Sequence, residues 1–316
     1  MPIYSELPTT LFEAQMRYLK KRYRIVSLDD LLCELADPVN PEPAVAVTFD
    51  DGYPDLYREA FPILVKYKVP ATIYLTVGAI ETGEIAWYDR VFLALQAVPG
   101  NAFDFMLDGP RSFPLFSRAA RLAAAVAIIT WMRTLPDARR RTHCTELEKR
   151  VQIPKAELVG RMLTWEQVRS MSDAGVAFGS HTMTHPVVSH LTPADLEWEI
   201  LESKRILEEK IQTTVADFAY PFGKPDEISL EAQSMLARGA YRSAVTTTEG
   251  LNVPQTNPYH LCRCSIDENN SVSMFALRLN RLFLRGEYDQ AQPESESPVS
   301  ATGSRRQTAK EPVEKN

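Results

Sequence analysis

The sequence predicts an α/β fold in which helices cover a parallel sheet. Two apolar runs rich in β-branched residues, at 44–49 and 71–77, suit strands that are buried on both faces. The stretch between them, 54–67, has helical periodicity with a proline in its first turn. The same alternation of short apolar runs and helical patterns returns after residue 160, as expected for repeated strand–helix–strand units.

The other elements are predicted from periodicity and from helix-capping residues. Residues 12–19 have helical periodicity, and Ser27 is a candidate N-cap of the helix that follows. Thr164 and Gln167 have the spacing of a capping box, and Thr192 precedes a proline at the start of another helix. The remaining expected elements are strands at 176–179, 217–220 and 243–246, and helices at 227–238 and 271–284.

Two stretches depart from this alternation. Residues 81–160 are helical in pattern and rich in arginine, and we expect them to form an insertion within a domain that spans 1–286. Residues 287–316 are rich in proline, serine, glutamate and lysine and contain almost no large apolar side chains. Such a segment buries too little apolar surface to offset the entropy of ordering it, so we predict a disordered tail.

Deleting residues 287–316 should therefore leave the stability of the protein nearly unchanged. The deletion removes few apolar groups, and those groups contribute little to a core. The melting temperatures of the truncated and full-length chains provide the comparison. A large fall on truncation would contradict the prediction of a disordered tail.

The composition is that of a globular protein and argues against several classes of function. Of the 316 residues, 45% are hydrophobic and 24% are charged. The formal net charge is -6, whereas a nucleic-acid-binding domain usually presents a basic face. The longest apolar stretch, 122–132, is too short to span a bilayer. The four cysteines form neither paired metal-binding motifs nor a dense disulfide framework, and Cys262 and Cys264 are expected to pack on one face of a strand.

Two adjacent carboxylates follow the first predicted strand. Residues 48–52 have the sequence Thr-Phe-Asp-Asp-Gly, so Asp50 and Asp51 stand at the end of a buried strand, where α/β barrels place their active sites. Buried charges are costly unless they are paired or bind a metal. The Asp-Asp-Gly sequence is also common in surface turns, so this motif alone leaves a structural interpretation open.

A histidine pair forms the second motif. Residues 179–186 have the sequence Gly-Ser-His-Thr-Met-Thr-His-Pro, in which His181 and His185 are four residues apart. One helical turn would place both imidazoles on the same face. Two neutral imidazoles and one carboxylate form a common open site for zinc or a similar divalent ion. The alternative is that both histidines are ordinary polar residues of a loop.

Together the two motifs resemble those of the polysaccharide deacetylases, the NodB-homology domains of carbohydrate esterase family 4. The family patterns, Thr-Phe-Asp-Asp-Gly and His-Ser/Thr-x-x-His, are both matched in full. The resemblance covers about 12–284 outside the insertion and includes the flanking segments 69–75 and 163–165. It implies a distorted (β/α)7 barrel and an enzyme that removes N-acetyl groups from an amino-sugar polymer.

The resemblance also implies a role for each motif residue. Asp51, His181 and His185 would bind one divalent metal ion, with zinc the expected ion and cobalt or nickel the alternatives. Asp50 would act as the general base on a water molecule. The three ligand atoms should then converge on one point about 2.0–2.2 Å from each of them.

The third motif of the family, Arg-x-Pro-Phe/Tyr-Gly, is matched only in part by residues 219–223. Ala219 stands where the family has the arginine that orients the base, so the positioning of Asp50 is left open. The backbone N–H of Phe222 would be the oxyanion donor, and Tyr220 is a candidate substrate-binding residue, with core packing as the alternative for both side chains. Trp87 could line a sugar groove by stacking, or it could cap the inserted helix.

The acid histidine of the family is not found after residue 240. Residues 241–245 resemble a divergent branch that includes the biofilm-polysaccharide deacetylases, in which an N-terminal Tyr-His strand supplies the acid. Residues 1–7 contain neither a histidine nor a secretory signal, so we expect this chain to begin downstream of that strand and to be weakly active or inactive alone. A cytoplasmic location is the default expectation unless the natural N-terminus lies upstream. His260 is the weaker candidate for the acid.

Two competing hypotheses remain beside a deacetylase acting on an N-acetylated glycan. Some relatives with the same metal chemistry hydrolyse cyclic amides or imides. A barrel that binds glycan without turnover would also explain the missing arginine and acid histidine. The intact ligand set and Asp50 favour an enzyme. The sequence leaves the oligomeric state open.

Overall fold

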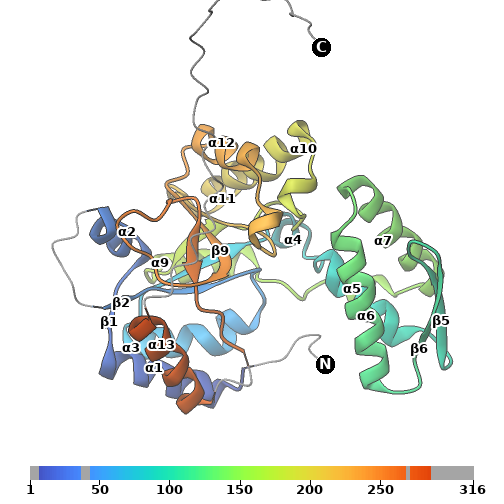
Figure 1. Ribbon diagram of the computed structural model, residues 1–316, viewed down its shortest axis with the longest axis horizontal. Coiled ribbons are helices and arrows are strands. Elements are labelled where there is room, and N and C mark those ends of the chain that lie inside the picture. Colours follow the sequence, from blue (N-terminus) through green and yellow to red (C-terminus); the bar gives the residue numbers. More distant parts are fainter. Residues whose placement is uncertain (1–6, 37–42, 268–270, 286–316) are drawn as a thin grey trace, which may run out of the picture.

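The computed structural model of the chain describes residues 7–36, 43–267 and 271–285 (Figure 1). A sheet surrounded by helices forms the larger part, and a lobe of helices with one hairpin stands to its side. The predictions about residues 1–6 and about the tail after residue 286 lie outside the described residues. In the described part of the chain, no helix combines the length and the apolar character that a membrane span requires.

A six-stranded parallel sheet forms the centre of the larger part. Its strand order is β10-β9-β8-β7-β4-β3, and every neighbouring pair is parallel. This confirms the prediction from the strand–helix alternation. A separate parallel pair joins β1 (Arg24–Ile25) to β2 (Ala44–Val45). The six strands are β3 (Val47–Phe49), β4 (Ala71–Leu75), β7 (Ala177–Ser180), β8 (Asp217–Ala219), β9 (Ser243–Glu249) and β10 (Leu261–Arg263).

Helices follow the strands and cover the sheet from outside (Figure 1). The predicted caps are confirmed: the Ser27 hydroxyl accepts from the Asp30 N–H at 3.0 Å, Thr164 forms a full capping box with Gln167, and Thr192 caps the helix that begins with a proline. The helices around the sheet are α1 (Thr9–Arg22), α2 (Leu28–Ala36), α3 (Phe61–Tyr67), α4 (Val77–Thr82), α9 (Trp165–Asp173), α10 (Pro193–Glu197), α11 (Ser203–Ile211), α12 (Leu230–Arg238) and α13 (Val272–Arg285).

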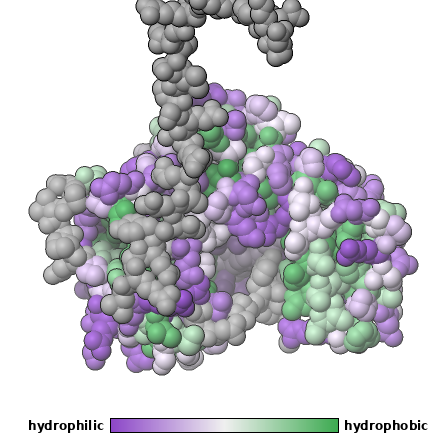
Figure 2. Space-filling model, in the orientation of Figure 1, coloured by the Kyte–Doolittle hydropathy of each residue, from purple (hydrophilic) through white to green (hydrophobic). Residues whose placement is uncertain are grey.

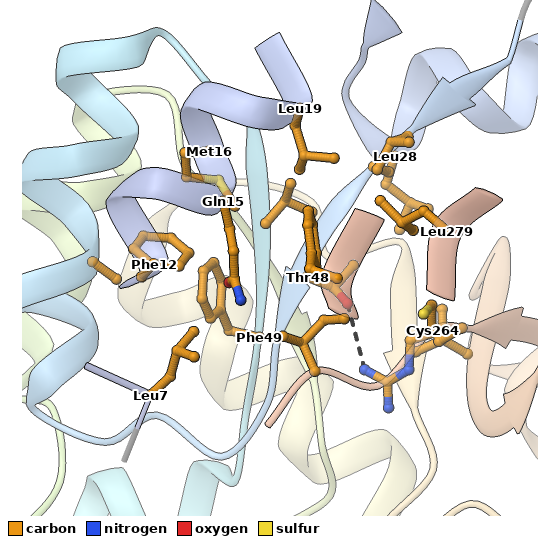
Figure 3. A pocket seen from close by; sticks show the side chains of 18 of the residues that line it. Leu7, Phe12, Gln15, Met16, Leu19, Leu28, Thr48, Phe49, Cys264 and Leu279 are labelled. Atoms are coloured by element: carbon orange, nitrogen blue, oxygen red, sulfur yellow. Dashed lines mark hydrogen bonds between the residues drawn. The ribbon is translucent and has the colours of Figure 1, made fainter. Parts of the chain in front are cut away.

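The sheet curls but does not close among the described residues, because β3 and β10 are its two edges. A cavity of about 1320 Å³ opens beside these edges and is lined mainly by apolar side chains of α1, α13, β3 and β10 (Figure 3). The strand predicted at 44–49 lies against this cavity. It is interrupted at Ala46 and is half-buried, so the prediction of one strand buried on both faces is wrong. The open edge leaves one side of β3 without a neighbouring strand in the described chain.

The lobe contains α5 (Trp87–Ala97), the hairpin β5–β6 (Ala102–Met106 and Pro110–Pro114), α6 (Arg118–Arg133), α7 (Asp137–Val151) and α8 (Lys155–Leu158). It has a hydrophobic cluster of its own. The expectation of an all-helical insertion was incomplete, because β5 and β6 pair as antiparallel strands. Apolar side chains are also exposed on its surface, among them Phe116, Leu122 and Val126, and Figure 2 shows apolar residues gathered on this lobe.

Candidate active site

The motif residues meet at the carboxyl edge of the parallel sheet. Asp50 and Asp51 follow β3, His181 follows β7, and residues 220–223 follow β8. Gly52 turns the chain directly after the two carboxylates, with φ +98°, and a Cβ there would lie 2.7 Å from Leu75 Cδ2. Glycine is therefore required both for the backbone conformation and for the close approach of β4. Beside this turn, the Asp51 carboxylate faces the histidine loop.

Asp51, His181 and His185 form a compact set of potential metal ligands. One ligand atom from each lies within 4.8 Å of the other two. The Asp51 Oδ1 atom is 3.7 Å from His181 Nε2 and 3.4 Å from His185 Nε2. In a tetrahedral site with bonds of about 2.1 Å, ligand atoms lie roughly 3.4 Å apart. The three side chains therefore fit one divalent ion, with a position left for water or substrate.

The surroundings of both histidines suit neutral imidazole ligands. His181 Nδ1 lies 2.7 Å from the Ala219 carbonyl oxygen, so the proton of the neutral ring belongs on Nδ1 and Nε2 keeps its lone pair toward Asp51. Burial and the proximity of His181 hold the pKa of His185 well below its usual value. A histidine that stays neutral is ready to bind a metal without first losing a proton.

The two imidazoles converge for a different reason from the one that their spacing predicts. Residues 181–185 form an irregular loop, not a helical turn, yet the ring centroids lie 4.7 Å apart. Thr182 and His185 have positive φ values of 68° and 57°, which fold the loop back on itself. Asp51 and Phe222 share this property, with φ values of 71° and 60°. Such strained conformations in non-glycine residues cluster at functional sites.

Glu199, a residue that the sequence motifs do not include, holds this loop in place. Its Oε2 atom accepts hydrogen bonds from the backbone N–H groups of Met183 at 2.8 Å and Thr184 at 2.9 Å, and its Oε1 atom accepts from the Thr184 hydroxyl. Glu199 is buried, and burial raises its pKa while the Thr184 hydrogen bonds lower it. A carboxylate with three donors is thus the support of the loop between the two histidines.

Replacing Glu199 with leucine should destabilise the protein and weaken metal binding together. The change leaves the buried N–H of Met183 and the partly buried N–H and hydroxyl of Thr184 without their acceptor, at a cost of about 2–4 kcal/mol in the free energy of unfolding. Glu199→Gln keeps one acceptor oxygen and should give an intermediate loss. Chemical denaturation and zinc titration of both variants provide the measurement. Wild-type metal affinity in Glu199→Leu would show that the loop does not depend on this carboxylate.

Asp50 is held by Arg263, which sequence reasoning did not find. The guanidinium donates two hydrogen bonds to the Asp50 carboxylate, Nη1 to Oδ1 and Nη2 to Oδ2, each at 2.8 Å. Burial alone would raise the pKa of Asp50, but the charge of Arg263, together with His181, lowers it to about 2. Asp50 is therefore ionised at neutral pH, as a general base must be. Arg263 therefore orients Asp50, the role that the resemblance assigns to an arginine at the position of Ala219.

Phe222, the predicted oxyanion donor, borders the histidine pair. Its ring packs edge-on against His185 with centroids 4.7 Å apart, and the Arg133 guanidinium lies 4.1 Å from the ring centroid. Within the described residues its backbone N–H donates no hydrogen bond, so that donor is available to a ligand. Tyr220, in contrast, is fully buried in the main hydrophobic cluster. Its ring has no exposed face for a sugar, and its position favours the alternative of core packing.

The other candidate residues lie further from the ligand set or are buried. Trp87 is buried, and its indole N–H donates to the His185 carbonyl oxygen at 3.0 Å, so its ring does not line an open groove. His260 precedes the amino end of β10, whereas Arg263 ends that strand, about 10 Å further along. Its ring Nε2 lies 3.3 Å from Gln233 Nε2. His190 belongs to the short helix Val188–His190 beyond the metal loop.

Comparison with known proteins assigns the chain to a family. A family model for polysaccharide deacetylases matches residues 37–238, more than half of the chain. The chain belongs to the polysaccharide deacetylases. A curated relative, YxkH of Bacillus subtilis, is described as a polysaccharide deacetylase. It is 23% identical over 271 residues, which cover 85% of this chain and 68% of YxkH.

Further relatives match this polysaccharide deacetylase in sequence or fold. The poly-β-1,6-N-acetyl-D-glucosamine N-deacetylase of Staphylococcus aureus is 34% identical over 70 residues, which are 22% of this chain and 24% of that protein. The deacetylase PplD of Streptococcus pyogenes has a TM-score of 0.59 at 21% identity, covering 87% of this chain and 88% of PplD. IcaB of Ammonifex degensii has a TM-score of 0.54 at 19% identity, covering 85% and 88%. The predicted deacetylase fold, a distorted (β/α)7 barrel, is thereby confirmed, and its insertion contains the hairpin β5–β6 beside the predicted helices.

Proposed function

We propose that this polysaccharide deacetylase is a metal-dependent hydrolase that removes N-acetyl groups from an amino-sugar polymer. The observation that carries the proposal is the set Asp51, His181 and His185 directly beside a half-buried Asp50 that is held ionised by Arg263. A polymer of β-1,6-linked N-acetylglucosamine is the proposed substrate class, because a relative that shares one segment of this chain carries that activity in its name.

The arrangement supports each part of an amide hydrolysis. A divalent ion at the three ligands would polarise the amide carbonyl and lower the pKa of a bound water molecule. Asp50, one residue from the ligand Asp51, accepts the proton of the attacking water. The free N–H of Phe222 donates to the oxygen that becomes negative in the tetrahedral transition state. Arg263 keeps the Asp50 carboxylate in a fixed orientation during this transfer.

The leaving nitrogen also needs a proton, and the described residues offer no histidine beside Asp50 apart from the two ligands. His260 lies before the amino end of β10, away from Arg263 and the base. We therefore also propose that the isolated chain is only weakly active. A general acid typically raises the rate by about 10²–10⁴.

Acetate release from oligomers of β-1,6- and β-1,4-linked N-acetylglucosamine tests the proposal. The protein is assayed after removal of metal with a chelator and after addition of zinc, cobalt or nickel. Acetate release that depends on the added ion and on Asp50 supports a deacetylase. Glycan binding without acetate release would favour the non-catalytic barrel, and turnover of cyclic amides or imides alone would favour the other hydrolase hypothesis.

A further inference from the structure

Three consecutive residues at the start of α5 each contact a different part of the candidate metal site. The Trp87 indole N–H donates to the His185 carbonyl oxygen at 3.0 Å, and the Tyr88 hydroxyl donates to Asp51 Oδ1 at 2.9 Å. Asp89 accepts a hydrogen bond from the Tyr53 hydroxyl at 2.6 Å, and Tyr53 belongs to the turn that carries Asp51. The inserted lobe therefore reaches two of the three proposed ligands directly.

We infer that residues 87–89 position the metal ligands, so that the inserted lobe sets the metal affinity of the barrel. The inference rests on the proposed metal site. Ligating carboxylates and histidines need partners that fix their orientation, and loss of such a partner commonly weakens metal binding about 10–100-fold. Tyr88 has the most direct role, because its hydroxyl contacts the same Asp51 oxygen that faces both histidines.

The packing around this segment makes it a rigid support. Trp87, Tyr88 and Asp89 are all buried. The Tyr88 ring packs edge-on against His185 with centroids 4.8 Å apart, and the Trp87 ring carries the Arg140 guanidinium 4.8 Å from its centroid. Arg140 belongs to α7 and is paired with the buried Asp137 of the same helix. Helix α7 of the lobe thus packs against the segment that contacts the ligand loop.

Single substitutions can distinguish a role in positioning the ligands from a role in core packing, because each can remove a hydrogen bond and keep the packing. Tyr88→Phe keeps the ring and its contact with His185, and it removes the hydroxyl that donates to Asp51. Trp87→Phe keeps an aromatic ring and removes the donor to the His185 carbonyl. Asp89→Asn keeps an acceptor oxygen for Tyr53, whereas Asp89→Leu removes it. The three positions therefore offer paired changes that differ by one hydrogen bond.

Titration of the metal-free protein with zinc, in competition with a chromophoric chelator, measures the affinity without any substrate. We expect Tyr88→Phe to bind zinc about 10–100-fold more weakly than the wild type. Trp87→Phe should fall in the same range, Asp89→Leu should be weakened, and Asp89→Asn should be close to the wild type. Tyr67→Phe is the matched control, because it removes a hydroxyl that donates to Glu13, remote from the site.

The visible spectrum of the cobalt-substituted protein gives a second measurement, since it reports the geometry around the ion. We expect a changed spectrum in Tyr88→Phe and an unchanged one in Tyr67→Phe. Wild-type zinc affinity and an unaltered cobalt spectrum in a folded Tyr88→Phe protein would overturn the inference. These measurements use no glycan, so they can fail while acetate release is observed, and they can succeed if the proposed substrate is wrong. A wild-type chain that binds neither ion would refute the underlying metal site instead.

Discussion

Replacing Asp50 with asparagine should lower the turnover number by about 10²–10⁴ and leave zinc affinity unchanged, because a general base contributes rate enhancement of that size. The change is nearly isosteric and removes the ability to accept a proton. Asp50 lies next to Asp51 in the sequence, yet its carboxylate is paired with Arg263 and does not belong to the compact set of Asp51, His181 and His185. A loss of this size with metal still bound would separate the base from the ligands.

Three measurements make this result decisive. Zinc titration of Asp50→Asn shows whether the ion is retained, and the melting temperature shows whether the loss of the Arg263 ion pair has unfolded the protein. Asp104→Asn, an exposed carboxylate on β5, is the matched control and should keep full activity. Loss of zinc from a folded Asp50→Asn protein would mean that Asp50 is a ligand and that the two aspartates have been assigned the wrong roles.

Replacing Arg263 with alanine should lower turnover by about 10²-fold near neutral pH and move the acidic limb of the pH–rate profile to higher pH. Burial raises the pKa of Asp50, and Arg263 is the main cause of its fall to about 2. Without the guanidinium, the pKa of Asp50 rises. Activity is then lost at a higher pH as the solution is acidified, because only the ionised carboxylate can accept a proton. Misorientation of the base adds to the loss at every pH.

Arg263→Lys distinguishes the charge from the geometry. It keeps a positive charge near Asp50 but loses the paired hydrogen bonds, so the acidic limb should stay near its wild-type position while turnover is partly lost. Arg111→Ala on β6, at an exposed position, is the control for removal of an arginine. An Arg263→Ala protein that is folded and loaded with metal, and that has an unshifted acidic limb, would show that Asp50 does not depend on this contact.

The sequence allowed the metal ligands and the base to be proposed because they lie in short local motifs at strand ends. The parallel sheet and the helix caps were predicted for the same reason, since periodicity and capping are local properties. The hairpin β5–β6 was missed although its signal is present in the sequence: apolar and polar residues alternate in Phe103-Asp104-Phe105, and Asp108-Gly109 is a favourable turn. The helical, arginine-rich pattern of the surrounding residues favours helices over the whole stretch 81–160.

The residues that support the motifs could not be predicted, because their contacts join distant parts of the chain. Arg263 and Asp50 are 213 residues apart, and no local pattern marks an arginine in a short strand as the partner of a given carboxylate. The contacts of Glu199 with the histidine loop and of Tyr88 with Asp51 have the same character. The convergence of His181 and His185 was predicted from helical spacing, whereas a strained loop produces it. Tertiary packing decides all of these contacts.

The position of Arg263 links catalysis to the integrity of the sheet. Asp50 follows one edge strand and Arg263 ends the other, so their ion pair spans the opening between β3 and β10, as does the contact of Arg263 with Thr48 (Figure 3). Edges of a sheet open at a lower free energy than its centre. A small widening of this seam would separate Asp50 from Arg263, whereas the contacts of Asp51 are with the histidine loop and Tyr88 and do not involve β10. Opening of this edge would therefore lower turnover at a smaller free-energy cost than unfolding of the whole sheet.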